Sequence, residues 1–176
     1  IKKAKSKHLK IPKNNFIMNN LETAVQRALV SINSAEIFIS RSSIIDFCNL
    51  TKDYSPLHRN PEIAKQYGLE DTPAAGTHLV ALLGRASRTI AHETGDYQLV
   101  GQETKFKGPL YPETTVKFNL GRLNIEEKGA VVNLELCSKG KKETIATAEA
   151  RFAEAYPTQQ NKKETQFREQ VEIGMQ

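Results

Sequence analysis

Residues 76–92, GTHLVALLGRASRTIAH, are the stretch that indicates the fold of this chain most clearly. Apolar side chains recur there every three or four residues, which is the spacing of one face of an α-helix. These side chains are Leu79, Leu82, Leu83, Ala86 and Ile90. Val80, Ala81 and Gly84 widen the apolar or small surface. We therefore expect a helix that is buried on more than one side and ends at Gly95.

The hydrophobic period changes to two after residue 97. Four segments then alternate apolar with polar side chains: QLVGQETKFKG, TTVKFNLGRLNI, AVVNLELCSKG and TIATAEARFAEA. Val116, Phe118 and Leu120 face one way, and Lys117 and Asn119 face the other. This alternation predicts a mostly antiparallel sheet with one solvated face. A long buried helix followed by such strands predicts an α+β layer in which the sheet wraps around the helix.

Four shorter elements are expected before the long helix. They are a helix over residues 20–31, a strand over 35–39, a helix through residue 50 that Ser40 or Ser42 caps, and a short helix over 61–68. The last of these begins with proline and closes with glycine. Each start and stop signal is a local one, because capping hydroxyls, early prolines and terminal glycines satisfy or relax the helix ends.

The charge of the chain is concentrated at its beginning. The 176 residues suit one domain with extensions, and 39% of them are apolar, which is enough for a core. Residues 1–21 hold six lysines and no acidic residue. The rest of the chain then has 19 basic and 20 acidic residues and is nearly neutral. We expect a basic arm and short helix over 1–34, one domain over 35–156, and a polar tail over 157–176. The arm is either a solvated tail or a contact for RNA, an acidic protein or an anionic cofactor.

The composition also excludes several classes of protein. No apolar run reaches the roughly 20 residues that a membrane-spanning helix needs, and no signal-peptide pattern opens the chain. Two cysteines, Cys48 and Cys137, are too few for a disulfide framework or a cysteine-rich zinc site. We expect a protein with no membrane contact, and we interpret the basic arm as a solvated tail in preference to a nucleic-acid contact. Its expected compartment is the cytoplasm, with a mitochondrion or peroxisome as the alternative.

Asp53 and His58 are the candidate catalytic residues. They lie in DYSPLH, where a carboxylate and an imidazole are separated by a Ser-Pro pair that cannot continue a helix. The bend can bring the two side chains together, and such a pair can hold a water molecule and move its proton. Taken alone, Asp53 also fits a turn cap, and His58 also fits a surface or core histidine.

A longer stretch resembles the MaoC-like, (R)-specific enoyl-CoA hydratase family. That family has a helix with F-A-x-L-[ST]-x-D, then D-x-N-P-[LI]-H, a P-x-x-A helix, and H-G opening a long helix. The matching positions are Phe47, Leu50, Thr51, Asp53, Pro56, Leu57, His58, Pro61, Ala64 and Gly76. A second family signature, F-x-x-P-V-[YF]-P-G-D-T-[LV], is similar to FKGPLYPETTV over residues 106–116. The resemblance covers residues 36–155.

The resemblance implies the hot-dog fold, an antiparallel sheet wrapped around a long central helix. It implies a homodimer that acts on acyl thioesters of coenzyme A or acyl carrier protein without metal or redox cofactor. The implied reaction adds water reversibly to a trans-2-enoyl thioester and forms a (3R)-hydroxyacyl thioester.

The resemblance also implies residue roles. Asp53 and His58 would activate the water, and the N–H of Gly76 would stabilise the thioester oxyanion at the positive end of the helix. Ser55, Ala75 and Thr77 are the expected substrate-binding residues.

This chain departs from the family pattern at three places. Ser55 replaces asparagine, and its hydroxyl can still make local turn hydrogen bonds. Ala75 replaces the histidine before Gly76. His78 lies two residues after Gly76, about 200° further round the helix, and we interpret it as structural. Glu113 and the following threonine replace Gly-Asp, which we interpret as a change of turn only.

Other functions remain open from these residues. The change at Ala75 and the basic arm would suit a non-catalytic subunit or scaffold that partners an active homologue. A thioesterase on the same fold would carry an acid on the long helix, and residues 76–91 have none. An RNA- or protein-binding module would use the lysine arm. Arg85, Arg88, Lys105 and Lys107 fit either phosphate contacts or solvated charges.

Overall fold

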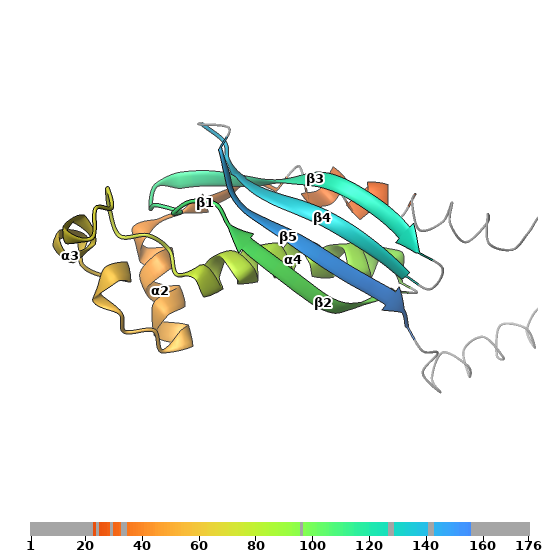
Figure 1. Ribbon diagram of the computed structural model, residues 1–176, viewed down its shortest axis with the longest axis horizontal. Helices are drawn as coiled ribbons and strands as arrows, with labels where there is room; N and C mark the ends of the chain where they lie inside the picture. Colours follow the sequence, from red (N-terminus) through yellow and green to blue (C-terminus); the bar gives the residue numbers. More distant parts are fainter. Residues whose placement is uncertain are drawn as a thin grey trace, which may run out of the picture.

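The long helix α4 runs from Gly76 to Thr94 and lies along the sheet (Figure 1). Its inward face buries seven residues: His78, Leu79, Leu83, Gly84, Ala86, Ser87 and Ile90. The helix ends at Gly95, whose φ of 64° is left-handed and therefore suits glycine. The predicted helix and its end at Gly95 are confirmed. The computed structural model describes residues 23, 25–28, 30–32, 35–95, 97–126, 129–140 and 143–155.

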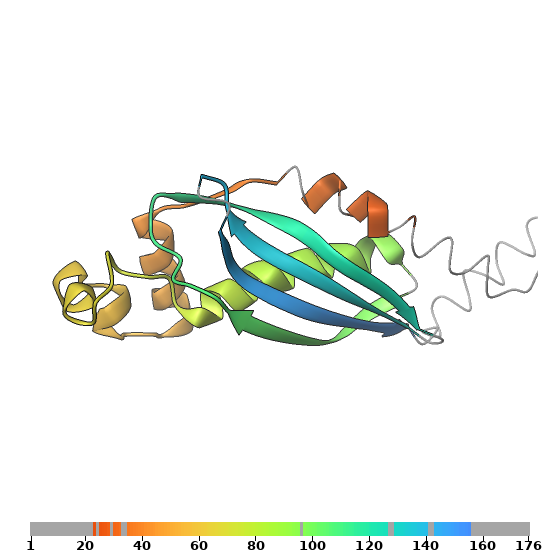
Figure 2. The same cartoon turned by 45° about the horizontal axis from the view of Figure 1, so that its top comes forward.

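In the described part of the chain, five antiparallel strands curl around α4. They are β1 (Ile37–Ile39), β2 (Tyr97–Phe106), β3 (Thr114–Glu126), β4 (Gly129–Ser138) and β5 (Thr144–Glu154). Their order across the sheet is β1-β3-β4-β5-β2. Figures 1 and 2 both show α4 on the concave side of this sheet. The predicted α+β layer is therefore confirmed.

The core lies between the sheet and α4. Every second side chain of β4 is buried, at Ala130, Val132, Leu134 and Leu136, and these meet the buried side of α4. Helical residues before β1 also enter this core. Val25, Ala28 and Ile32 are almost completely buried within it. The helix predicted over residues 20–31 therefore packs against the domain over its described part.

Three short helices gather at the end of the molecule where α4 begins (Figure 2). They are α2 (Arg41–Thr51), the 3₁₀ helix η1 (Pro56–His58) and α3 (Pro61–Gln66). Ser40 caps α2 by accepting the N–H of Ser43 at 3.1 Å, so the first of the two predicted caps is the one used. Asn60 caps α3 in the same way, and Gly68 follows it with a left-handed φ of 78°.

The arm over residues 1–21 and the tail over 157–176 lie outside the described residues. Within the described part of the chain, no helix is both long enough and apolar enough to cross a bilayer.

Candidate active site

Asp53 follows the end of α2, where the chain leaves the helix axis. Lys52 adopts a left-handed conformation with φ of 57°, and the N–H of Asp53 donates to the Cys48 oxygen at 2.8 Å. The Oδ1 atom of Asp53 accepts the N–H of Ser55 at 3.0 Å. This is the local turn that short carboxylate side chains favour. It anchors one oxygen of Asp53, while the other, Oδ2, faces His58.

His58 ends η1 and lies beside Asp53. The Nε2 atom of His58 is 3.8 Å from Oδ2 of Asp53, and the side chains are 15% and 31% exposed. The other ring nitrogen, Nδ1, lies 2.8 Å from the backbone oxygen of Pro73. A carbonyl oxygen only accepts hydrogen bonds, so Nδ1 carries the hydrogen. In the neutral imidazole, Nε2 therefore presents its lone pair toward Asp53.

The separation within the pair decides what it can do. A distance of 3.8 Å exceeds that of a direct hydrogen bond. The carboxylate and the unprotonated nitrogen are both acceptors, so they can share the hydrogens of a small polar molecule held between them. Two acceptors on one donor are suited to removing a proton from it.

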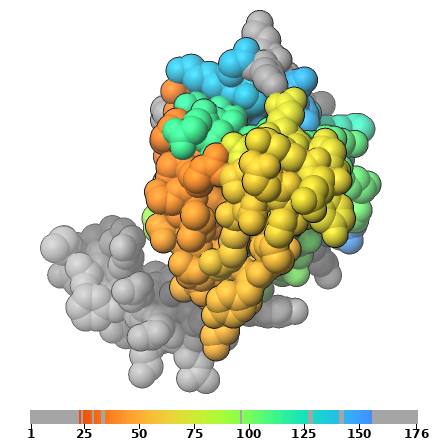
Figure 3. Space-filling view, turned by 90° about the vertical axis from the view of Figure 1, so that its left-hand side faces the viewer, coloured from red at the N-terminus to blue at the C-terminus, as the bar shows by residue number. Residues whose placement is uncertain are grey.

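Arg59 holds the backbone of Asp53, and sequence reasoning did not single it out. Its Nε and Nη2 atoms donate to the backbone oxygen of Asp53 at 3.2 and 3.1 Å. Nη2 also donates to Oδ1 of Asn49 at 2.8 Å, and the guanidinium lies 5.3 Å from the centre of the Tyr54 ring. The adjacency of arginine to DYSPLH was the available signal. Figure 3 views the end of the molecule to which these residues belong.

Gly76 is the first residue of α4. Its predecessor Ala75 is the N-cap and makes no side-chain capping bond. The first N–H groups of a helix have no acceptor within the helix, so those of Gly76 and Thr77 point outward at its positive end. A Cβ atom at Gly76 would lie 3.2 Å from the ring of Phe106. The close ring leaves little room for a larger residue at this position.

The three expected substrate-binding residues differ in exposure. Ser55 is half-buried, its backbone N–H donates to Asp53, and its side chain makes no capping bond to η1. Ala75 is 2% exposed. Thr77 is exposed beside Gly76. Pro73, which holds His58, lies three residues before Gly76, so the chain between them spans at most about 11 Å.

His78 and Cys48 lie inside the molecule. The His78 ring stacks on Phe47 with 4.2 Å between ring centres, and its buried Nδ1 has no hydrogen-bond partner among the described residues. Burial lowers the pKa of His78, so its ring is neutral. Burial also raises the pKa of Cys48, with a smaller contribution from the charge of Asp53, which keeps the thiol protonated.

The basic residues noted in the sequence lie on α4 and at the end of β2. Arg85 and Arg88 are exposed along α4, and Lys105 and Lys107 are exposed at the end of β2 and just after it. The Nζ atom of Lys105 lies 3.4 Å from Oε1 of Glu103, so this lysine already has an acidic partner.

Known proteins resemble the chain in sequence family and in fold. The family model described as the MaoC-like domain matches residues 22–144. The (R)-hydratase from A. caviae involved in PHA biosynthesis is 20% identical, with a TM-score of 0.57 over 69% of this chain and 92% of that one. A search of curated proteins finds no match.

Two solved complexes from Mycobacterium tuberculosis are similar as well. The ChsH1-ChsH2 complex gives 15% identity and a TM-score of 0.58 over 69% of this chain and 92% of that chain. The HadBC complex, described as a 3R-hydroxyacyl-ACP dehydratase, gives 14% identity and a TM-score of 0.56 over 68% of this chain and 90% of that chain. These likenesses show the fold.

Proposed function

The chain belongs to the family of MaoC-like domains, a dehydratase family with the hot-dog fold, and from this premise we propose that it hydrates trans-2-enoyl thioesters reversibly. The product is a (3R)-hydroxyacyl thioester. The observation that carries the proposal is the Asp53–His58 pair, in which Nε2 of a defined tautomer faces a carboxylate at 3.8 Å. The acyl carrier is coenzyme A or acyl carrier protein.

The proposed chemistry needs only the atoms of water. Water binds between Oδ2 of Asp53 and Nε2 of His58, and its oxygen bonds to C3 as the pair removes a proton. The electrons of the C2–C3 double bond move onto the thioester oxygen, and a proton is then delivered to C2. One hydrogen and one hydroxyl group are added in total, so the proposal includes no metal or redox cofactor.

Gly76 is proposed to stabilise the intermediate. Negative charge develops on the thioester oxygen, and an exposed N–H at a helix N-terminus is a preorganised donor for it. The missing side chain lets a carbonyl approach closely. We propose that Ser55, Ala75 and Thr77 line the acyl thioester around this position.

We propose that the chain forms a homodimer through β2. Among the described residues, β2 is the last strand of the sheet order, next to β5, and an edge strand can pair with a strand of another chain. Val100 and Phe106 on β2 and Val80 on α4 are large exposed apolar residues. Light scattering of the purified chain tests the dimer. A complex with a different chain is the competing outcome, and two of the similar structures are themselves described as complexes.

A second candidate function is a non-catalytic subunit. The observation that favours it is Ala75, which offers no side-chain donor at the proposed oxyanion position. The retained Asp53–His58 geometry favours an enzyme instead.

The test is loss of enoyl-thioester absorbance with crotonyl-CoA and with a longer 2-enoyl-CoA. Chiral analysis of the product should give the (3R) alcohol. Carrier-protein thioesters follow if the coenzyme A substrates are inert. Absence of turnover on every carrier and chain length would exclude the hydratase and favour the silent subunit.

A further inference from the structure

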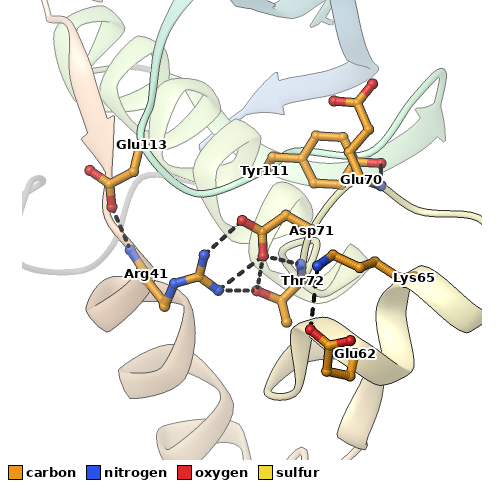
Figure 4. Close-up of polar contacts among 8 residues, drawn as sticks. All are labelled: Arg41, Glu62, Lys65, Glu70, Asp71, Thr72, Tyr111 and Glu113. Carbon is orange, nitrogen blue, oxygen red and sulfur yellow. Dashed lines mark hydrogen bonds and ion pairs between the residues drawn. The ribbon is translucent and has the colours of Figure 1, made fainter.

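Arg41 joins three segments that are far apart in the sequence (Figure 4). Its Nη1 and Nη2 atoms donate to the two carboxylate oxygens of Asp71 at 3.0 and 2.6 Å, and Nη1 also donates to Oγ1 of Thr72 at 2.9 Å. The backbone N–H of Arg41 donates to Oε1 of Glu113 at 3.3 Å. We call Arg41, Asp71, Thr72 and Glu113 the Arg41 clamp.

The Arg41 clamp has the geometry of a specific contact. A planar guanidinium that engages both oxygens of one carboxylate restrains its orientation as well as its position, which a lysine cannot do. Its hydrogen bond holds the pKa of Asp71 below the usual range, so the carboxylate stays charged. Thr72 is 1% exposed, which leaves its side chain little freedom once Arg41 is bound.

The clamp lies immediately before Pro73, the residue whose carbonyl holds His58. On the other side of Pro73, the N–H of Ala74 donates to the Leu110 oxygen at 2.7 Å, and Leu110 is fully buried. The proline ring itself fixes φ. Restraints on both sides therefore set the direction of the Pro73 carbonyl, which receives Nδ1 of His58 at 2.8 Å.

We propose that Arg41 is a positioning residue that sets the ring orientation and tautomer of His58 by holding the segment around Pro73. The link to hydration rests on the proposed function, whereas the link to the tautomer rests on the contacts alone. Without the clamp, only the proline ring and the hydrogen bond from Ala74 to Leu110 restrain this segment, so the Pro73 carbonyl is held less tightly. The His58 ring then populates the tautomer that carries hydrogen on Nε2, which cannot accept a proton from water.

The expected kinetic effect follows from this loss of orientation. Misplacing a reacting group by about 1 Å can cost roughly a hundredfold in rate. We expect Arg41→Gln to lower kcat by about tenfold or more and to leave KM within about twofold, because no substrate contact is removed.

The experiment uses the full chain and reads the tautomer directly. The ¹⁵N resonances of the His58 ring, assigned by their loss in His58→Gln, are recorded in alkaline buffer for the wild type and Arg41→Gln. The matched control is Arg151→Gln, which removes another arginine–carboxylate pair, 2.9 Å from Glu149. We expect the Nδ1–H form in the wild type and Arg151→Gln, and a mixture in Arg41→Gln.

Two further variants keep the test decisive if Arg41→Gln fails to fold. Asp71→Asn keeps the arginine but removes the charged fork, and Arg41→Lys keeps the charge but not the two parallel bonds. Both should show the mixed tautomer with native circular dichroism. An unchanged tautomer and unchanged kcat in the folded variants would overturn the proposal. If the wild type turns over no thioester, the proposed function fails while the ring resonances still decide the role of Arg41.

Discussion

The Nδ1 atom of His58 lies 2.8 Å from the backbone oxygen of Pro73, and this contact determines which nitrogen of the ring faces Asp53. Pro73 belongs to the segment that leads into α4, and Asp53 follows the end of α2. One imidazole thus links the two parts of the proposed site. The Pro73 oxygen, which orients His58, lies only three residues before Gly76, the first residue of α4.

Replacing Gly76 tests the proposed oxyanion position. Gly76→Ala should lower kcat by about tenfold or more, because the added methyl group stands where the thioester carbonyl would approach. The methyl group also meets the Phe106 ring at 3.2 Å. Gly76→Ala/Phe106→Ala relieves that clash and serves as the control. We expect it to remain slow relative to Phe106→Ala alone, and recovery to that level would contradict a role of Gly76 in catalysis.

Acid titration tests the charge of Asp71. Hydrogen bonding by Arg41 holds the pKa of Asp71 below its ordinary 3.8. The unfolded chain therefore binds this proton at a higher pH than the folded chain, and the stabilisation is complete above about pH 4 and lost as pH falls through the folded pKa. The difference in unfolding free energy between wild type and Asp71→Asn should shrink on acidification. A difference that grows would show that Asp71 is not held as a carboxylate.

Titration of His78 has a different pH window. Burial lowers the pKa of His78 below its ordinary 6.5. As pH falls, the unfolded chain takes up this proton before the folded chain does. The free energy of unfolding therefore decreases as pH falls below about 6.5. His78→Phe keeps a ring against Phe47 and removes the unpartnered nitrogen. Urea unfolding at about pH 7.5 and about pH 5.5 should show a smaller pH effect in this variant.

The same variant tests whether His78 is structural. His78→Phe should keep wild-type kcat, since its ring packs on Phe47. A folded His78→Phe without activity would instead assign His78 to the catalytic machinery.

Truncation tests the domain boundaries. We propose that the domain runs from about residue 22 to residue 156, because Val25 is already part of the core. Deletion of residues 1–21 and 157–176 should leave thermal unfolding and kcat unchanged. Salt-sensitive binding of RNA that disappears with the arm would assign the arm a contact role, and loss of folding would show that a terminal segment belongs to the domain.

The fold was predictable because its main elements carry strong periodic signals. The 3.6-residue period of α4 and the two-residue period of β3 and β4 can each be recognised within the segment itself, without knowledge of the segments that it packs against. The approach of Asp53 to His58 was predictable for a local reason, since Ser55 and Pro56 bend the chain between them. Val25, Ala28 and Ile32 pack more closely with the domain than an arm would, because their side chains belong to the core.

The supporting contacts carry no comparable signal. The Pro73 oxygen is a backbone atom, and Arg41 meets Asp71 across 30 positions without any periodic pattern. Glu113 was interpreted as a change of turn only. It adopts a left-handed φ of 58°, at a cost of roughly 1 kcal/mol, and its carboxylate accepts the N–H of Arg41. Such contacts follow from the way distant segments meet.

The most direct test of the central claim compares each residue of the pair with a matched residue outside it. Hydration of crotonyl-CoA is assayed for the pair variants Asp53→Asn and His58→Ala. The matched controls are Asp46→Asn and His92→Ala. Circular dichroism first shows that each variant folds natively. Asp46 and His92 are exposed. The account predicts a loss of kcat of about a hundredfold or more in the two pair variants and wild-type rates in the two controls. Wild-type turnover by folded Asp53→Asn or His58→Ala would contradict it.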